Sequence, residues 1–345
     1  MVEKRVFGKT KSGEVVYAFT VKDGERSAVI LTYGGAVQSL VVPDREGNPV
    51  DVLLGYDTLR EYEEGDAFFG ALIGRVGNRL GGAKFSIDGT EYRVSRNEPF
   101  HSLHGGFRGF DKVVWQGEEI ENGVKLSYLS KDGEEGYPGN LQVEVRYTFF
   151  NGEFSVDYHA VSDKATAIAM TWHGYFNLNG AGRESGTDNF LQIRSDEILP
   201  SDENLLPTGE FRKVKGTPFD FNEAKRMGKD LFADDIDLKH GKGYDHCFLL
   251  RNGKRFEKCA EAYSERTGIC MECFTDLPAL QLYSANYVDQ KGKGGYYAPN
   301  CAYALEAQAI TNNLNVPAYA KLSSSLYRAG EEYRYRTSYR FGVKQ

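Results

Sequence analysis

Cysteine is scarce in this chain of 345 residues, and long apolar runs are absent from its sequence. Five cysteines is an odd and modest number for this length, so we expect a reducing compartment and, by default, the cytoplasm. No segment approaches the roughly 20 apolar residues of a membrane span, and the N-terminal stretch MVEKRVFGKTKSGEV lacks the apolar run of a signal peptide. The sequence therefore predicts a soluble protein with no membrane partner.

An excess of positive charge is missing as well. The chain has 42 Lys and Arg residues against 49 Asp and Glu residues, which gives a formal net charge of -7. Proteins that bind nucleic acid usually carry a basic stripe or interleaved aromatic and basic residues, and this sequence has neither. We therefore expect no nucleic-acid partner.

Motifs of several large enzyme classes are also lacking. The sequence has no GxSxG elbow, no HExxH, no P-loop and no dinucleotide-binding fingerprint after a strand, and GRVGNRLGG (Gly74 to Gly82) fits none of these spacings. Cys270 and Cys273 lie in an apolar, strand-like run without two further zinc ligands at suitable spacing, so we expect core thiols there. Phosphate cradling and hydride transfer are disfavoured, and we expect neither a metal nor a cofactor.

What the sequence does contain is a recurring hairpin signal. Asp-Gly and Asn-Gly pairs favour tight hairpin turns, and each pair here lies between short runs rich in Val, Ile, Tyr, Phe and Thr. The pairs are Asp23-Gly24, Asp88-Gly89, Asn122-Gly123, Asp132-Gly133, Asn151-Gly152 and Asn252-Gly253. Around Asn151-Gly152 the flanking runs LQVEVRYTFF and EFSVDYHAV alternate apolar and polar residues, which predicts two antiparallel strands.

Helical periodicity is scarce by comparison. Short helical turns are expected around Thr58 to Glu64 and Ala233 to Leu238. Alternating strand and helix patterns, fixed-period repeats and Pro- or Ser-rich linkers are missing, which disfavours a parallel βαβ sheet, a propeller and a division into domains. We predict one all-β domain over residues 1–345, a large antiparallel β-sandwich with few short helices and long functional loops.

Polar residues gather with glycine and aromatics in four of the expected loops, where a rigid scaffold can aim functional groups. These are Ile73 to Gly82 with Asn78 and Arg79, Asn97 to Lys112 with His104, Thr171 to Gly180 with His173, and Tyr303 to Asn315 with Glu306.

Each of these residues also has a purely structural explanation. Arg79 could pair with a surface carboxylate, and Glu306 could lie on the solvated face of a strand. His104 could hold the adjacent Gly-Gly turn by hydrogen-bonding a carbonyl, and His173 could be a satisfied core histidine. Considered together, two histidines, one carboxylate and several aromatics on a β scaffold favour proton transfer on a small polar substrate such as a sugar.

The sequence resembles the galactose mutarotase (aldose 1-epimerase) family over nearly its whole length. The most specific motifs are GRVGNR, NEPFHSLHGGFRGFDK, HGYFNLNG, PTGEF with GTPFDF, GYDHCFLL and LEAQ. Proteins of this family have a large antiparallel β-supersandwich fold, which agrees with the hairpin pattern. The resemblance implies an isomerase of hexose metabolism that acts on monosaccharides such as D-galactose and D-glucose.

The resemblance also assigns roles to individual positions. The general base falls on Glu306 of LEAQ, the general acid on His173 before GYFNL, and a second active-site histidine on His104 of SLHGG. The implied substrate-binding residues are Asn78, Arg79, Asp245 and Gln281. Within the loop Asn97 to Lys112, we expect the glycines to turn His104 toward the sugar, Phe100, Phe107 and Phe110 to anchor the loop, and His101 to be structural.

Mutarotation interconverts the α and β anomers of an aldose through ring opening and reclosure. A carboxylate with a pKa near 4 is ionised at neutral pH and can take the proton of the C1 hydroxyl. An imidazole with a pKa near 6.5 is cationic often enough to protonate the ring oxygen. This chemistry needs no metal or redox cofactor. The sequence does not decide between a monomer and a homodimer.

Three positions depart from the family pattern. Trp172 stands before His173 where asparagine is usual, and His101 replaces a more typical asparagine. Ala329 precedes Gly330 where a proline is common. The first two bear on sugar preference, and the third concerns a turn.

Two other functions remain possible from the sequence. One is epimerisation of a phosphorylated aldose, as in the hexose-6-phosphate epimerases that share this fold, which would need further cations around C6 of the sugar. The other is a non-catalytic sugar-binding protein on the same scaffold, which the abundant aromatics would permit.

Overall fold

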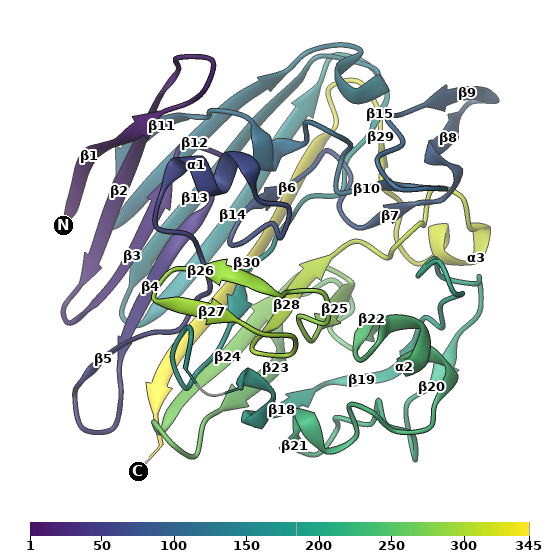
Figure 1. Ribbon diagram of the computed structural model, residues 1–345. Helices are drawn as coiled ribbons and strands as arrows, with labels where there is room; N and C mark the ends of the chain where they lie inside the picture. Colours follow the sequence, from purple (N-terminus) through teal and green to yellow (C-terminus); the bar gives the residue numbers. More distant parts are fainter. Residues whose placement is uncertain (184, 345) are drawn as a thin grey trace.

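The computed structural model of the protein describes residues 1–183 and 185–344, and strands dominate it (Figure 1). The helices of this described part are short: α1 (Leu59–Glu64), α2 (Ile236–Gly241) and α3 (Pro317–Ala320). None of them is long and apolar enough to cross a membrane.

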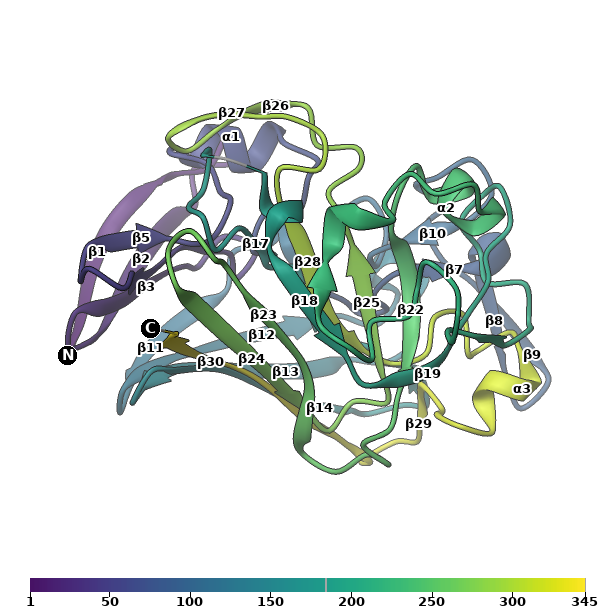
Figure 2. The same cartoon turned by 90° about the horizontal axis from the view of Figure 1, so that it is seen from below.

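Two large antiparallel sheets face each other, as Figure 2 shows most clearly. The nine-stranded sheet has the order β11 (Gln116–Ile120), β12 (Gly123–Ser130), β13 (Leu141–Phe150), β14 (Glu153–Ser162), β30 (Glu332–Val343), β24 (Ile269–Thr275), β23 (Glu257–Tyr263), β18 (Phe190–Ile193) and β21 (Lys225–Arg226). The six-stranded sheet has the order β17 (Tyr175–Phe176), β28 (Tyr303–Gln308), β25 (Ala279–Tyr283), β22 (Asp245–Leu250), β19 (Ser195–Ile198) and β20 (Arg212–Lys213).

Smaller sheets complete the structure at the N-terminal side and around the rim (Figure 1). A five-stranded sheet runs β1 (Val2–Lys9), β2 (Val15–Asp23), β3 (Arg26–Leu31), β4 (Val37–Pro43) and β5 (Pro49–Asp51). Two-stranded pairs are β6 (Leu72–Ile73) with β16 (Thr171–Trp172), β7 (Arg79–Leu80) with β10 (Ser102–Leu103), β8 (Lys84–Ile87) with β9 (Thr90–Arg93), β15 (Thr166–Ala167) with β29 (Leu326–Tyr327), and β26 (Gln290–Gly292) with β27 (Gly295–Tyr297).

Alternating side chains fill the space between the large sheets. In β13 the odd-numbered residues from Leu141 to Phe149 are buried, because successive residues of a strand point to opposite faces. They join one core cluster with Leu280 of β25 and Leu305 of β28, on the opposite sheet. The predicted antiparallel β-sandwich with few short helices is therefore confirmed.

Four of the predicted hairpins form as expected. The pairs at positions 23–24, 88–89, 122–123 and 151–152 join β2 to β3, β8 to β9, β11 to β12, and β13 to β14. Asp132-Gly133 also lies between two strands that pair, β12 and β13, but in a longer loop than a tight turn. The expected hairpin at Asn252-Gly253 is wrong, because this pair connects β22 to β23, which belong to different sheets. The buried Asn252 amide donates to the carbonyl oxygens of Thr275 and Leu277, which holds the crossover in place.

The helix starts follow side-chain caps. Thr58 and Glu61 form a capping box at the start of α1, which confirms the expected helical turn there. The second helix begins at Ile236, three residues later than expected, because the Asp235 side chain caps it by accepting from the Asp237 amide. Cys270 and Cys273 lie on β24, where Cys273 is buried and Cys270 is partly buried.

Candidate active site

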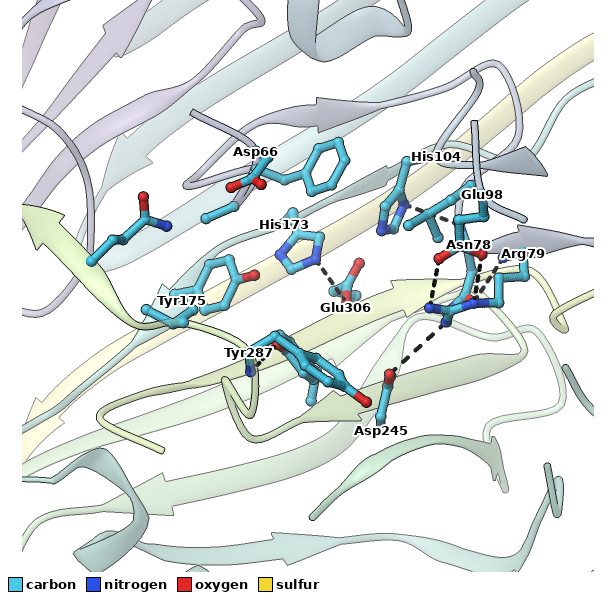
Figure 3. Close-up of a pocket in the computed structure, with 16 residues that line it drawn as sticks. Asp66, Asn78, Arg79, Glu98, His104, His173, Tyr175, Asp245, Tyr287 and Glu306 are labelled. Atoms are coloured by element: carbon cyan, nitrogen blue, oxygen red, sulfur yellow. Dashed lines mark hydrogen bonds and ion pairs between the residues drawn. The ribbon is translucent and has the colours of Figure 1, made fainter. Parts of the chain in front are cut away.

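A cavity of about 250 Å³ opens where the six-stranded sheet meets the loops around β6, β7 and β16 (Figure 3). Six of the seven residues implied as catalytic or substrate-binding line it: Asn78, Arg79, His104, His173, Asp245 and Glu306. These residues are distant in the sequence, and the fold brings them together. The seventh, Gln281, does not contribute to the lining.

Glu306 lies on β28, which runs between β17 and β25 in the six-stranded sheet. Its side chain is buried, and its Oε1 lies 3.5 Å from Nε2 of His173. Its other oxygen, Oε2, has no hydrogen-bond partner within residues 1–183 and 185–344. Burial, and next the charge of Asp245, raise the pKa of Glu306 well above that of an ordinary carboxyl.

His173 stands between β16 and β17, and its backbone is fixed on both sides. Its N–H donates to the carbonyl oxygen of Ala71 at 2.9 Å, and its own carbonyl accepts from the N–H of Gly70 at 2.9 Å. The Tyr175 ring stacks on the imidazole with 4.7 Å between centroids. Burial lowers the pKa of His173 to about 3, because a cationic imidazole is poorly solvated in this environment.

His104 adopts the left-handed region at φ 54°, and two hydrogen bonds with Asn78 hold it there. Its N–H donates to the Asn78 carbonyl at 3.2 Å, and its Nδ1 accepts from the Asn78 N–H at 3.2 Å. Because Nδ1 is an acceptor, the neutral ring carries its proton on Nε2. Burial, then His173 and Arg79, lower the pKa of His104 well below its usual value.

Arg79 is held between two carboxylates at one end of the cavity (Figure 3). Its Nε and Nη2 donate to the two oxygens of Glu98 at 3.0 and 2.9 Å, which is a bidentate pair. Its Nη1 lies 3.9 Å from Oδ2 of Asp245. Burial raises the pKa of Asp245, and the nearby Arg79 charge opposes that shift.

The remaining two implied binding residues differ in placement. Asn78 lines the cavity at φ 57°, and its Oδ1 accepts from the N–H of Arg79 at 2.8 Å. Gln281 pairs with Glu306 across strands β25 and β28, and its Nε2 donates to Oδ1 of Asp245 at 2.7 Å. Gln281 therefore does not line the cavity, and its hydrogen bond orients the carboxylate of Asp245, which does.

The expected ordinary pKa values of the acid and the base are wrong. Sequence motifs carry no information on desolvation, whereas Glu306 and His173 are both buried in the folded protein. Burial disfavours the charged form of each group, so the pKa of the carboxyl rises and the pKa of the imidazole falls. Burial therefore favours the neutral form of both members of the pair.

The loop Asn97 to Lys112 is anchored by fewer aromatics than expected. Phe110 is buried against Trp115, whereas Phe100 and Phe107 are 59% and 69% exposed. The turn instead depends on Gly105, at φ 94°, where a Cβ atom would lie 2.0 Å from the Gly74 carbonyl oxygen.

The residues that depart from the family pattern do not line the cavity. The Nδ1 atom of His101 accepts from the N–H of Gly82 at 3.3 Å, which agrees with its expected structural role. Trp172 is buried beneath the site, and its Nε1 donates to the carbonyl oxygen of Gly70 at 2.7 Å. Gly330, at φ 77°, forms the turn expected before β30.

Several lining residues have no counterpart in the sequence predictions. They are Asp66, Phe68, Glu98, Tyr175, Tyr283, Tyr287 and Gln290, among others. Glu98 lies in the motif NEPFHSLHGGFRGFDK and Tyr175 in the motif HGYFNLNG. The position of these polar and aromatic side chains beside His104 and His173 could have indicated them as lining residues. Phe68 lies outside every motif, and nothing local marks it.

Comparisons with known proteins show the family to which the chain belongs. The family model described as Aldose 1-epimerase matches residues 17–340. Galactose mutarotase of Homo sapiens is 40% identical over 346 residues, which cover 99% of this chain and 99% of that protein. Aldose 1-epimerase of Escherichia coli (strain K12) is 36% identical over 318 residues, covering 90% and 91%. Among solved structures, the GalM/aldose epimerase homologue from C. elegans matches with a TM-score of 0.86 at 29% identity, covering 94% of this chain and 98% of that one.

Proposed function

The chain belongs to the aldose 1-epimerase family and is an isomerase, and from this premise we propose that Glu306 and His173 transfer the protons that interconvert the anomers of D-galactose and D-glucose. The supporting observation is the 3.5 Å separation of His173 Nε2 and Glu306 Oε1 inside a cavity of about 250 Å³. Mutarotation needs one acid and one base on neighbouring oxygens of the substrate, and this pair offers both within one site.

The reaction proceeds by two coupled proton transfers. The Glu306 carboxylate takes the proton of the C1 hydroxyl, and the His173 imidazolium protonates the ring oxygen as the C1–O5 bond breaks. The open aldehyde rotates about the C1–C2 bond. The ring then closes on the other face of C1, with the protons returning along the same two paths.

The buried pair suits this cycle because it needs one shared proton. A protonated carboxyl beside a neutral imidazole has the same proton count as a carboxylate beside an imidazolium. Burial favours the first arrangement, since it disfavours both charges. Transfer of the shared proton from Glu306 to His173 converts this first arrangement into the carboxylate and the imidazolium that open the ring. Ring opening returns the pair to the first arrangement, and ring closure restores the carboxylate and the imidazolium.

The other lining residues hold the sugar in this proposal. The Nε2–H of His104 donates to the ring oxygen as charge develops there, and its ring centroid lies 5.3 Å from that of His173. Arg79 and Asp245 bind hydroxyl groups at the far end of the cavity, and Asn78 and Gln281 support them through the hydrogen bonds described above.

Polarimetry on freshly dissolved α-D-galactose and α-D-glucose tests the assignment. Glu306→Gln and His173→Asn should each lower kcat by about 10²- to 10⁴-fold. The chain offers a matched control, because His159 Nε2 lies 3.6 Å from Glu332 Oε1 in a partly exposed pair on β14 and β30. Glu332→Gln and His159→Asn should leave the rate unchanged. Near-normal rates in the folded Glu306 and His173 variants would refute the assignment.

A phosphorylated aldose fits the cavity poorly. Four carboxylates line it, from Asp66, Glu98, Asp245 and Glu306, and among the described lining residues Arg79 is the sole Lys or Arg. Its guanidinium is already paired with Glu98. We therefore expect α-D-glucose to turn over much faster than its 6-phosphate, and the reverse order would favour the phosphorylated substrate.

A non-catalytic sugar-binding protein would retain the cavity without using the acid and base. Calorimetric binding of galactose with no acceleration of mutarotation would support that function instead. For location we propose the cytoplasm, which the five free cysteines support. As a working assembly we propose a monomer or homodimer, without a nucleic-acid or membrane partner.

A further inference from the structure

One lining residue, Phe68, combines an unusual backbone with contacts to both histidines. Its φ is 56°, in the left-handed region that bulky side chains rarely adopt. Its ring centroid lies 4.7 Å from that of His104 and 6.0 Å from that of His173, and it is nearly parallel to the latter at 20°. An outlier of this kind persists where surrounding contacts hold it, and it often marks a functional site.

The next residues explain how the turn is held. Phe69 points away from the cavity into a buried cluster, where its ring packs against Tyr175 and Tyr297 at 5.2 and 5.5 Å. Gly70 also lies in the left-handed region, at φ 64°. Two consecutive phenylalanines are thus directed to opposite sides, one into the core and one into the cavity.

Trp172 stabilises the turn from Phe68 to Gly70 by a hydrogen bond to the carbonyl of Gly70. Its Nε1 donates to the Gly70 carbonyl at 2.7 Å, and that carbonyl also accepts from the N–H of Val37 at 2.9 Å. The Gly70 N–H in turn donates to the carbonyl of His173. The indole is itself locked by the rings of Phe154, Phe176 and Tyr339, with centroids 5.3 to 5.8 Å away.

Gly174 makes room for this arrangement. A Cβ atom at Gly174 would lie 2.4 Å from the Trp172 ring, so the indole at position 172 requires a glycine at position 174. His173 stands between them in the sequence. The segment Trp172-His173-Gly174 therefore links the turn that carries Phe68 to the backbone of the proposed acid.

We propose that Phe68 is a positioning residue for His104 and His173, and that Trp172 acts through Gly70 to hold the Phe68 ring against them. The ring limits the rotation of both imidazoles and keeps water away from them. Neither residue donates or accepts a proton in the reaction. This inference rests on the proposed roles of His104 and His173.

Kinetics of Phe68 variants test the first half of the proposal. Phe68→Ala should lower kcat by about 10- to 100-fold, because small misplacements of catalytic groups are costly, while KM for galactose changes less than about threefold. Phe68→Tyr, which keeps the ring, should restore kcat to within about threefold of the wild type. Phe68→Leu keeps a large apolar side chain but removes the ring, so its kcat should stay lowered. It replaces Phe68→Ala in the test if the alanine variant does not fold.

Different results would overturn this role. A rise in KM without loss of kcat would mean that Phe68 contacts the sugar and does not position the histidines. Full activity in Phe68→Ala, or equal rescue by leucine and tyrosine, would remove the need for the ring. Phe107→Ala is the matched control, since Phe107 is exposed in the neighbouring loop, and it should behave as the wild type.

A double-mutant cycle tests the role of Trp172. Trp172→Phe keeps a buried ring but removes the donor to Gly70, so kcat should fall by less than in Phe68→Ala. Because Trp172 acts through Phe68, the double variant should have the kcat of Phe68→Ala alone. Additive losses, with each variant shown to be folded by circular dichroism, would show that Trp172 acts independently of Phe68 and would overturn its proposed role.

Failure of this inference is distinguishable from failure of the proposed function. Loss of activity in Glu306→Gln and His173→Asn with normal kcat in Phe68→Ala would refute the positioning role alone. Normal activity in Glu306→Gln and His173→Asn would refute the proposed acid and base, and the positioning role with them.

Discussion

Nε2 of His173 lies 3.5 Å from Oε1 of Glu306, and both side chains are almost completely buried. This relationship predicts the acid side of the pH profile. In the proposed mechanism the pair works with one shared proton, and a second proton is added only near the lowered pKa of His173, about 3. We therefore expect kcat/KM to be maintained as the pH falls from about 5 to 4, where an ordinary carboxyl would already be titrating.

Polarimetry corrected for the spontaneous reaction measures this profile, with circular dichroism at each pH to confirm folding. A midpoint near 4.5 in the wild type would mean that the pair is solvated in the functioning enzyme. His159→Asn again serves as the control, because that imidazole is partly exposed on β14.

The bidentate pair of Arg79 and Glu98 predicts that Arg79→Lys, which keeps the positive charge, weakens substrate binding. Lysine cannot reproduce the two parallel bonds of the guanidinium to Glu98, and its ammonium is free to move away from Asp245. We expect Arg79→Lys to raise KM for galactose by roughly 10-fold or more with a smaller effect on kcat, as for loss of a 1.4 kcal/mol binding contact.

An exposed pair of the same geometry provides the control. Arg328 binds both oxygens of Asp88 on the surface, and Arg328→Lys should change neither constant. Glu98→Gln should raise KM in the same direction as Arg79→Lys, since it releases the guanidinium. An unchanged KM in Arg79→Lys would remove Arg79 from the proposed binding residues.

His104 allows the backbone and side-chain roles to be separated. Its left-handed φ of 54° suits asparagine, which tolerates this region better than alanine. We expect His104→Asn to keep its melting temperature within a few degrees while kcat falls by roughly 10²-fold, the typical cost of removing one preorganised donor. Thermal denaturation measures the melting temperature and polarimetry measures kcat, both on the same samples. A proportional loss of stability and activity would mean that His104 mainly supports the turn.

Local signals predicted the scaffold well, and they failed where distant contacts decide. Asn151-Gly152 joins two strands that pair along their whole length, so turn chemistry and alternation were sufficient. Asn252-Gly253 has the same chemistry, but the strand that follows it belongs to the other sheet, which no local pattern reveals. That residues 1–345 form a single domain stays a prediction.

The candidate site shows the same division. Glu306, His173 and His104 lie in recognisable motifs, and the fold brings them together in one cavity. Their pKa shifts come from burial by segments far away in the sequence, and so does the contact of Phe68 with both imidazoles. Phe68 lies in the stretch GDAFFG (Gly65 to Gly70), which belongs to none of the motifs named above. Its importance depends on a backbone angle that only the assembled turn imposes.

Asp111 provides a stability prediction outside the cavity. It lies near the end of the loop Asn97 to Lys112, is 7% exposed, and burial raises its pKa to about 7. The ammonium of neighbouring Lys112 donates to the carbonyl oxygens of Tyr62 and Gly65 at 3.1 and 2.6 Å, so it is directed toward these backbone groups.

Between the unfolded pKa of 3.8 and the folded value of about 7, the native state holds a proton on Asp111 that the unfolded chain has released. Stability therefore falls as the pH rises through this window. At about 1.4 kcal/mol per pKa unit, the loss between pH 4 and pH 8 is at most about 4 kcal/mol. Asp111→Asn cannot ionise, so urea unfolding of this variant should show a smaller decline over the same range. The exposed Asp57→Asn should retain the wild-type decline, and an identical decline in Asp111→Asn would mean that Asp111 is ionised in the folded protein at pH 6.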